Sequence, residues 1–196
     1  MLSFEDVSKL ARSWPERALI AIDGLPLAGK STLAERLSLE VGAHCLFLDD
    51  FVRPEVDWPS RERPSFPFEF VRYDAFLAAV RGLAAHGACV FDAFDWETGL
   101  MDPAPRKLRR DRPVIVEGVS ALHPELAPLY DVRIWVESDP ATTLAASIGR
   151  GVGGWAEPWE RLFLPSVALY LETRPRTRAD LIAAGRGARS TAQAAS

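Results

Sequence analysis

Short apolar runs alternate along most of this chain with longer segments in which apolar residues recur at helical spacing. A continuous apolar run bounded by turn-forming residues is typical of a strand that is buried on both faces. We expect strands over residues 18–23, 44–48, 88–92, 114–117, 132–137 and 179–183. Together, these segments predict a sheet that is buried within the protein.

The segments between these runs predict helices. Residues 30–41 place Leu33, Leu37 and Val41 on one helical face. Similar spacing predicts helices over residues 74–86, 142–148 and 159–171. Strands that alternate with helices favour a mostly parallel sheet, because each parallel connection must cross over a face of the sheet. The expected fold class is therefore α/β, a three-layer sandwich with helices on both faces of a central sheet.

Two irregular segments interrupt the alternation. Residues 53–67 are dense in proline and tryptophan, and residues 149–158 are rich in glycine. Long irregular segments in a compact domain are often lids or binding loops. We expect one domain over residues 1–184 with a small lid at about residues 149–158. The small, polar residues 185–196 predict a flexible C-terminal tail.

Composition limits the classes of partner. The chain has 196 residues, of which 48% are hydrophobic, and these suffice for one sizeable core. A net charge of −4 argues against a nucleic-acid partner, because proteins that bind nucleic acids are normally basic. No run resembles a signal peptide or a membrane span, so we expect a cytoplasmic protein with no membrane partner and with Cys45 and Cys89 reduced. The oligomeric state is left open.

The strongest motif is GLPLAGKS, over residues 24–31, which has the pattern G-x-x-x-x-G-K-[ST]. It follows an apolar strand and opens an amphipathic helix, which is the context that a phosphate-binding loop requires. Glycines at both ends let successive backbone N–H groups converge on phosphates, and the helix N-terminus favours anions. Lys30 is expected to bridge the β- and γ-phosphates of ATP, and the Ser31 hydroxyl to bind Mg²⁺. The residues expected to contact the nucleotide are Gly24, Leu25, Pro26, Leu27, Ala28, Gly29, Lys30, Ser31 and Thr32.

Acidic residues follow several of the expected strands. Asp49, Asp50, Asp92, Asp95 and Glu117 fall at or just beyond strand ends, where ligands bind in open parallel sheets. A kinase needs a carboxylate to take the proton of the acceptor hydroxyl and others to hold Mg²⁺. We assign Asp49, in preference to Asp50, as the base; Asp49 and Glu117 are also assigned as metal ligands. The alternative is that such acids cap helices or bind loop amides.

At these residues the sequence resembles the uridine kinase and phosphoribulokinase family of P-loop kinases, which also includes bacterial pantothenate kinase. Four stretches match in order: IDGLPLAGKST, LFLDDF, VIVEG and DVRIWVESDP. The resemblance spans roughly residues 18–182 and implies the P-loop NTPase fold. It also implies that Asp49 is the catalytic base, that Lys30 and Ser31 contact phosphate and Mg²⁺, and that Glu117 is the second acid.

The sequence departs from the family at two places. The family carries an arginine-rich lid, whereas the stretch AASIGRGVGG retains Arg150, which we assign to transition-state charge stabilisation. In FDAFDWETG, Trp96 lies near the place where the family has a histidine for a pyrimidine, so the acceptor is not assigned as uridine. Arg176 lies in a region that borders the adenine in similar kinases. The remaining candidates for acceptor contacts are Asp50, Arg53, Phe94 and Trp96.

The leading hypothesis is an ATP-dependent kinase that phosphorylates a hydroxyl of a nucleoside-like or other small metabolite. Two alternatives stay open. One is a nucleotide-dependent switch or ATPase, and the other is a phosphotransferase that acts on an antibiotic or a larger acceptor. The acid pair after the second expected strand, Asp49 and Asp50, favours a kinase over a switch.

Overall fold

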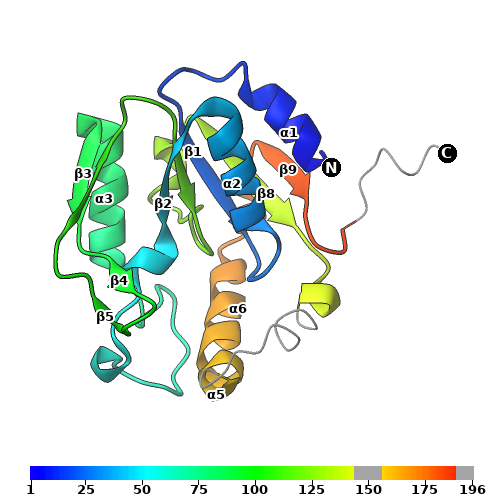
Figure 1. Ribbon diagram of the computed structural model, residues 1–196. Coiled ribbons are helices and arrows are strands. Elements are labelled where there is room, and N and C mark those ends of the chain that lie inside the picture. The colour runs from blue at the N-terminus through cyan, green and yellow to red at the C-terminus, as the bar shows by residue number, and fades with distance from the viewer. Residues whose placement is uncertain (144–155, 189–196) are drawn as a thin grey trace.

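A computed structural model describes residues 1–143 and 156–188 of the chain. Its centre is a parallel sheet of five strands in the order β2-β7-β1-β8-β9 (Figure 1). The strands are β1 (Leu19–Gly24), β2 (His44–Phe47), β7 (Val114–Glu117), β8 (Val132–Glu137) and β9 (Leu181–Ala184). The first strand therefore lies in the middle, between two strands from much later in the sequence.

Alternating side chains of the central strands supply two separate cores. Leu19 and Ala21 of β1 belong to one core, whereas Ile20 and Ile22 belong to the other. The two cores lie on opposite faces of the sheet because successive side chains of a strand point in opposite directions. Every residue of β1 is buried, which explains why residues 19–22 form a continuous apolar run rather than an alternating one.

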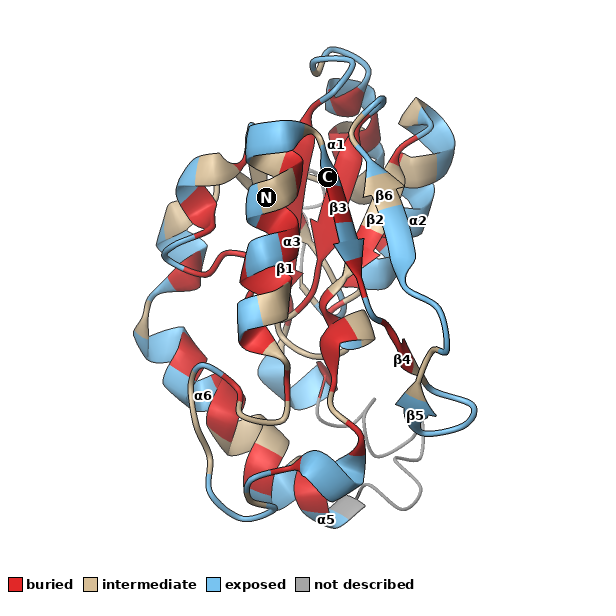
Figure 2. Ribbon diagram, turned by 90° about the vertical axis from the view of Figure 1, so that its left-hand side faces the viewer, coloured by how far each residue is buried: buried red, intermediate tan, exposed pale blue. Residues whose placement is uncertain are grey.

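Helices cover both faces of the sheet. Val7 and Ala11 of α1 (Phe4–Ala11) and the apolar face of α2 (Lys30–Val41) pack in one core. Helices α3 (Tyr73–His86) and α6 (Leu164–Glu172) pack in the other core. Figure 2 shows the buried strands enclosed between these two layers. The expected α/β three-layer sandwich is confirmed.

One expected strand lies elsewhere than we predicted. β3 (Ala88–Phe91) pairs antiparallel with β6 (Arg106–Arg109) and forms no part of the central sheet. Its burial alternates, with Cys89 and Phe91 buried, because only one side of this small sheet packs on the core. A second small sheet pairs β4 (Phe94–Asp95) with β5 (Leu100–Met101). Asp92 and Asp95 therefore do not end strands of the central sheet.

The predicted helix over residues 159–171 is compound. It begins as α5 (Ala156–Pro158), continues as a π-helical stretch (Trp159–Phe163) and ends as α6. Within the described part of the chain, four 3₁₀ turns join other elements: Leu48–Phe51, Glu55–Asp57, Ala127–Leu129 and Pro175–Arg178. Of the helix predicted over residues 142–148, residues 142 and 143 are helical, and the rest lies outside the described residues.

The expected lid and tail fall largely outside the described residues. Arg150 and the rest of residues 144–155 are not described, and neither are residues 189–196. Residues 185–188 are described, and the backbone holds them in place: Gly185 N–H donates to the Glu137 carbonyl at 2.7 Å, and Arg186 N–H donates to the Ala28 carbonyl at 2.9 Å. Among the described helices, none is both long and apolar enough to cross a membrane.

Candidate active site

The turn between β1 and α2 depends on a glycine at each end. A Cβ on Gly24 would lie 2.5 Å from the Val136 carbonyl oxygen, so a side chain there would push β1 away from β8. Gly29 caps the start of α2 with φ +105°, a conformation that side chains disfavour. The loop therefore turns directly into a twelve-residue helix, and the free N–H groups at the start of that helix attract anions.

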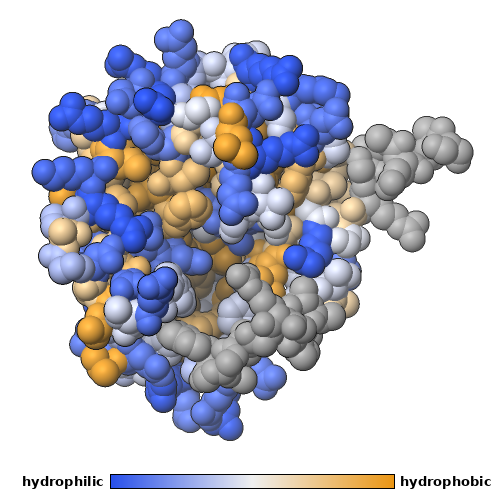
Figure 3. All heavy atoms as spheres, viewed as in Figure 1, coloured by the Kyte–Doolittle hydropathy of each residue, from blue (hydrophilic) through white to orange (hydrophobic). Residues whose placement is uncertain are grey.

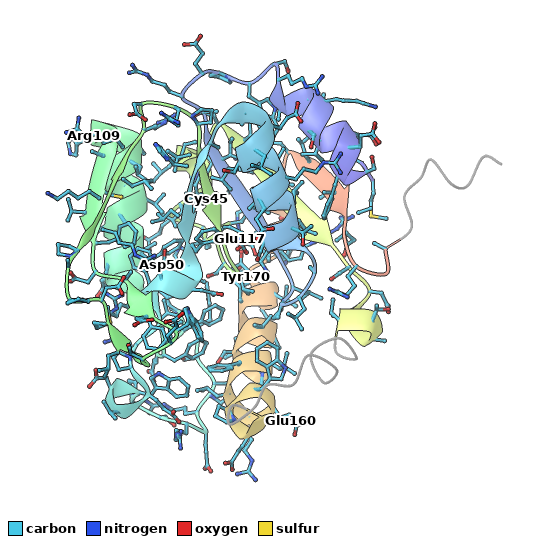
Figure 4. All side chains as sticks on the ribbon, in the orientation of Figure 1. Cys45, Asp50, Arg109, Glu117, Glu160 and Tyr170 are labelled. Atoms are coloured by element: carbon cyan, nitrogen blue, oxygen red, sulfur yellow. The ribbon has the colours of Figure 1, made fainter. Side chains whose placement is uncertain are left out.

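Three side chains of the loop and the neighbouring strand form one polar cluster. Lys30 is buried, and its Nζ donates to the Leu25 carbonyl at 2.9 Å and lies 3.9 Å from Glu117 Oε1. Ser31 Oγ donates to Glu117 Oε2 at 3.2 Å. Glu117 ends β7, which pairs with β1 in parallel register, so the sheet itself brings the acid beside the loop. Figure 4 shows Glu117 at this edge of the sheet.

The carboxyl group of Glu117 has a strongly altered affinity for protons. Its pKa is raised from 4.5 to about 7, chiefly because burial disfavours the charged form and also because the Asp49 carboxylate lies nearby. Lys30 and the hydrogen bond from Ser31 oppose this shift. A buried acid held between a cation and a hydroxyl is a group that gains from a divalent cation, because the cation offsets the cost of desolvating the carboxylate.

A cavity of about 500 Å³ opens beside this cluster. One side of it consists of the phosphate loop and the start of α2, including Lys30, Ser31 and Thr32. Asp49, which is exposed on the 3₁₀ turn that follows β2, and Glu117 also line the cavity. Figure 3 shows this hollow near the centre of the face, with apolar atoms on its walls. Among the described residues, the cavity thus brings together the loop and both acids that the sequence singled out.

The remainder of the cavity wall is apolar and largely aromatic. Its rings come from the loop after the 3₁₀ turns, from the β4–β5 turn and from the π-helical stretch: Phe68, Phe70, Trp96, Trp159 and Phe163. Phe70 and Phe163 have ring centroids 4.5 Å apart, and Phe68 stacks on Phe70 at 5.3 Å. The rings of Phe68, Phe70, Phe163 and Trp159 thus form a joined surface.

Several residues that the sequence suggested for substrate or nucleotide contacts do not line this cavity. Asp50 is half-buried and its carboxylate pairs with Arg106 at 2.9 Å; burial raises its pKa and Arg106 opposes that rise. Arg53 Nε donates to the Glu69 carbonyl at 3.0 Å, which fixes the loop.

Phe94 and Arg176 also lie outside the cavity lining, whereas Trp96 is part of it. Phe94 is buried in the core and meets the exposed Trp96 edge-on, at 5.0 Å between ring centroids. Arg176 pairs with Glu137 at 2.6 Å on the 3₁₀ turn before β9. Of the acceptor-side candidates, only Trp96 is placed to touch a ligand in this cavity.

A buried carboxylate behind the phosphate loop was not singled out from the sequence. Asp23, the residue before Gly24, is fully buried and accepts hydrogen bonds from the N–H groups of Gly24, Ser120 and Leu122. Tyr170 of α6 donates a fourth hydrogen bond to it, at 2.5 Å. Burial raises the pKa of Asp23, while these hydrogen bonds favour its charged form. The network ties α6 to the strand that carries the loop.

Arg186 is a second residue that the sequence did not reveal, because it lies within the expected tail. Its Nε donates to the Leu27 carbonyl at 3.0 Å, and its side chain lines the cavity beside the phosphate loop. Gly185 makes this approach feasible: a Cβ there would lie 2.3 Å from the Ala28 carbonyl oxygen. A small residue followed by arginine after the last strand was the only signal in the sequence.

The residues fit a nucleotide phosphate chain with a divalent cation. The loop offers backbone N–H groups and Lys30, whereas Ser31, Asp49 and Glu117 offer oxygen ligands. Within residues 1–143 and 156–188, no group of three or more His, Cys, Asp or Glu side chains is arranged to hold a metal ion alone. This donor set suits Mg²⁺, which is usually held by one or two carboxylates together with substrate phosphates.

No family model matches the chain. Among the solved structures that share its architecture are the following two. A protein from Bacillus stearothermophilus, provisionally named a uridine kinase, has a TM-score of 0.69 and 20% identity, over 91% of this chain and 96% of its own. A protein from Silicibacter sp. TM1040, provisionally named a fructose transport system kinase, has a TM-score of 0.60 and 19% identity, over 90% and 98%. The protein therefore shares the fold of these two structures, an α/β sandwich around a five-stranded parallel sheet.

Proposed function

We propose that the protein is an ATP-dependent kinase that transfers the γ-phosphate to a hydroxyl of a small molecule. The observation that carries the proposal is that Asp49 lines the same cavity as Lys30 and Ser31 of the phosphate loop. Nucleotide hydrolysis needs no acceptor pocket, whereas here an apolar chamber opens beside the loop and the acid. Kinase-type names on both similar structures agree with this reading.

Each polar residue has a distinct task in the proposed reaction. Asp49 orients the acceptor hydroxyl and takes its proton, since it is exposed to the cavity. The hydroxyl oxygen then forms a bond to the γ-phosphorus, and the bond from that phosphorus to the bridging oxygen of ADP breaks. Lys30 and the loop N–H groups hold the phosphates in line and stabilise the charge that moves onto the leaving oxygen.

Ser31 and Glu117 would hold the Mg²⁺ ion. When bound, Mg²⁺ neutralises charge on the β- and γ-phosphates. Glu117 keeps Ser31 Oγ oriented through the hydrogen bond between them, and Lys30 stays near Glu117 when the phosphates are absent. Arg150, which lies outside the described residues, is proposed as a lid arginine, and Arg186 as an additional contact on the nucleotide side.

The proposal is tested by measuring ADP release with a panel of alcohols, including nucleosides, sugars and vitamins. Acceptor-dependent ADP, together with a product heavier by one phosphate, is the expected result. Lys30→Ala should abolish nucleotide binding, and Asp49→Asn should retain binding of Mg-ATP in calorimetry while losing transfer. ATP hydrolysis that no acceptor changes would instead support an ATPase or switch. Loss of ATP binding in Asp49→Asn as complete as in Lys30→Ala would refute its role as base.

A further inference from the structure

The part of the cavity that lies away from the phosphate loop, where an acceptor would bind, is lined mainly by apolar side chains. Apart from three acids, Glu35, Asp49 and Glu117, the described residues that line it away from the phosphate loop are all uncharged and almost all apolar. They are Leu48, Val52, Phe68, Phe70, Val71, Trp96, Gly118, Val119, Trp159, Phe163 and Val167. The described cations that line the cavity, Lys30 and Arg186, both lie at the phosphate loop. An anionic acceptor would thus meet acidic side chains and no described cation on its side.

Arginines are abundant around this side of the molecule, but their side chains bind carbonyl and carboxylate groups outside the cavity. Arg53 donates to the Glu69 carbonyl at 3.0 Å, and Arg106 pairs with the carboxylate of Asp50 at 2.9 Å. Arg72 donates to the Asp50 carbonyl at 2.9 Å. Three more are paired with carboxylates on the surface: Arg61, Arg63 and Arg161. None of these arginines lines the cavity, so its apolar lining reflects their placement rather than a shortage of arginine.

The apolar wall is built from aromatic rings that pack on one another. Phe68 and Phe70 stack with their planes 7° apart, and Phe163 closes on Phe70 at 4.5 Å. Trp96 stands on the short β4–β5 turn with 55% of its surface exposed, although an indole normally gains from burial. An exposed tryptophan at the wall of an aromatic cavity is placed to cover a ligand ring.

Resting on the kinase function proposed above, we propose that the acceptor is an uncharged alcohol whose hydroxyl is attached to a planar, apolar body. Aromatic rings favour such a body through apolar burial and edge or stacked ring contacts. A phosphate or carboxylate on the acceptor lacks a described partner, and a free sugar leaves most of its hydroxyl groups without hydrogen bonds against this wall. The hydroxyl proton passes to Asp49, the phosphoryl group moves to the hydroxyl oxygen, and ADP leaves.

Three probes of graded chemistry test the inference on the intact protein with Mg-ATP. They are 2-naphthalenemethanol, its 6-carboxylate derivative and ribose. We expect kcat/KM for the neutral naphthyl alcohol to exceed both others by about tenfold or more, because a buried unpaired charge or hydroxyl is strongly disfavoured. Ligand-observed NMR with Mg-ADP measures binding of the same probes independently of transfer.

Variants of Trp96 add a direct test of the wall. Trp96→Ala should raise KM for 2-naphthalenemethanol about three- to tenfold, as expected for loss of one ring contact, with the Kd for Mg-ATP unchanged. Trp96→Arg should improve kcat/KM for the carboxylate probe and impair that for the neutral one. Leu100→Ala, an exposed apolar residue of the same hairpin outside the cavity lining, is the matched control and should change neither.

The outcomes separate this inference from the function on which it rests. Equal or better transfer to the carboxylate probe or to ribose would refute the uncharged, apolar acceptor but would still support the kinase function. If no alcohol of any class increases ADP release, the kinase proposal fails. The NMR comparison then decides the ligand class: selective binding of the neutral probe upholds the apolar preference, and equal or absent binding refutes it.

Discussion

Glu117 gives the sharpest quantitative prediction, because burial of its carboxyl group largely sets the pKa of that group. The perturbation is Glu117→Gln, which keeps the shape and removes the titrating proton. The folded protein holds this proton up to about pH 7, whereas the unfolded chain releases it near 4.5. Between these two pKa values folding takes up a proton, so the stabilisation present at low pH is lost as the pH rises through 7.

The size of the effect follows from the two pKa values. Integrating proton uptake from pH 5 to pH 8 gives a loss of about 2–3 kcal/mol in the free energy of unfolding from this group. The side chain is only 8% exposed, so solvent screens little of this cost. As the pH rises from 5 to 8, the free energy of unfolding of Glu117→Gln should therefore increase by about 2–3 kcal/mol relative to that of the natural protein.

The assay is urea unfolding at both pH values, followed by circular dichroism in a chelator so that no divalent cation biases the result. Other groups also titrate, but their contributions cancel in the difference between the two proteins. Glu172→Gln, at the exposed end of α6, is the control and should show no such gain. A difference that changes by less than about 0.5 kcal/mol would show that Glu117 is ionised in the folded protein at neutral pH. The desolvation argument would then be refuted.

Three further outcomes are expected. Tyr170→Phe should lower the free energy of unfolding by about 1–3 kcal/mol in urea titrations, because the buried Asp23 loses one of its four donors. Gly185→Ala should cost about 1–3 kcal/mol and weaken Mg-ATP binding in calorimetry, because its Cβ would meet the Ala28 carbonyl oxygen at 2.3 Å and displace the phosphate loop. Arg53→Ala should leave KM for the acceptor unchanged in steady-state kinetics, because its side chain serves the loop and not the cavity.

Each of these has a clear contrary result. An unchanged unfolding midpoint in Tyr170→Phe would mean that water replaces the phenol and that α6 is not tied to Asp23. Normal nucleotide affinity in a folded Gly185→Ala protein would show that the loop after β9 adapts freely. A large rise in KM with unaltered stability in Arg53→Ala would restore that residue to the acceptor site.

The sequence predicted the centre of the fold well because the signals there are local. The β1–loop–α2 unit combines an apolar run, two glycines and an amphipathic helix within residues 19–41, and each part constrains the next. Strand β3 misled the prediction, since ACVF is as apolar as a central strand. Its partner β6, with the sequence RKLR, carries only Leu108 as an apolar side chain and gave no strand signal. Which strands share a sheet depends on pairing across long separations, which apolar content does not encode.

For the candidate site, the sequence singled out the loop and the acids, but only Trp96 of the aromatic wall. Lys30, Ser31, Asp49 and Glu117 were chosen from motif and strand ends, and the fold gathers them at one cavity. Asp50 is diverted by Arg106, a residue 56 positions away in the chain. The contact of Arg186 with the phosphate loop could not be predicted from the sequence, because it depends on the position of β9 in the sheet. Contacts of this kind arise from topology and leave no local pattern in the chain.

The central position of β1 has a consequence for how the protein is made. Both neighbours of β1 come late, since about 90 residues separate Gly24 from the first residue of β7, and β8 follows later still. As the chain leaves the ribosome, the strand that carries the phosphate loop is complete but has neither edge paired. Closing such long loops is entropically costly and slow. During synthesis, this strand is therefore the stretch that has most to gain from a chaperone.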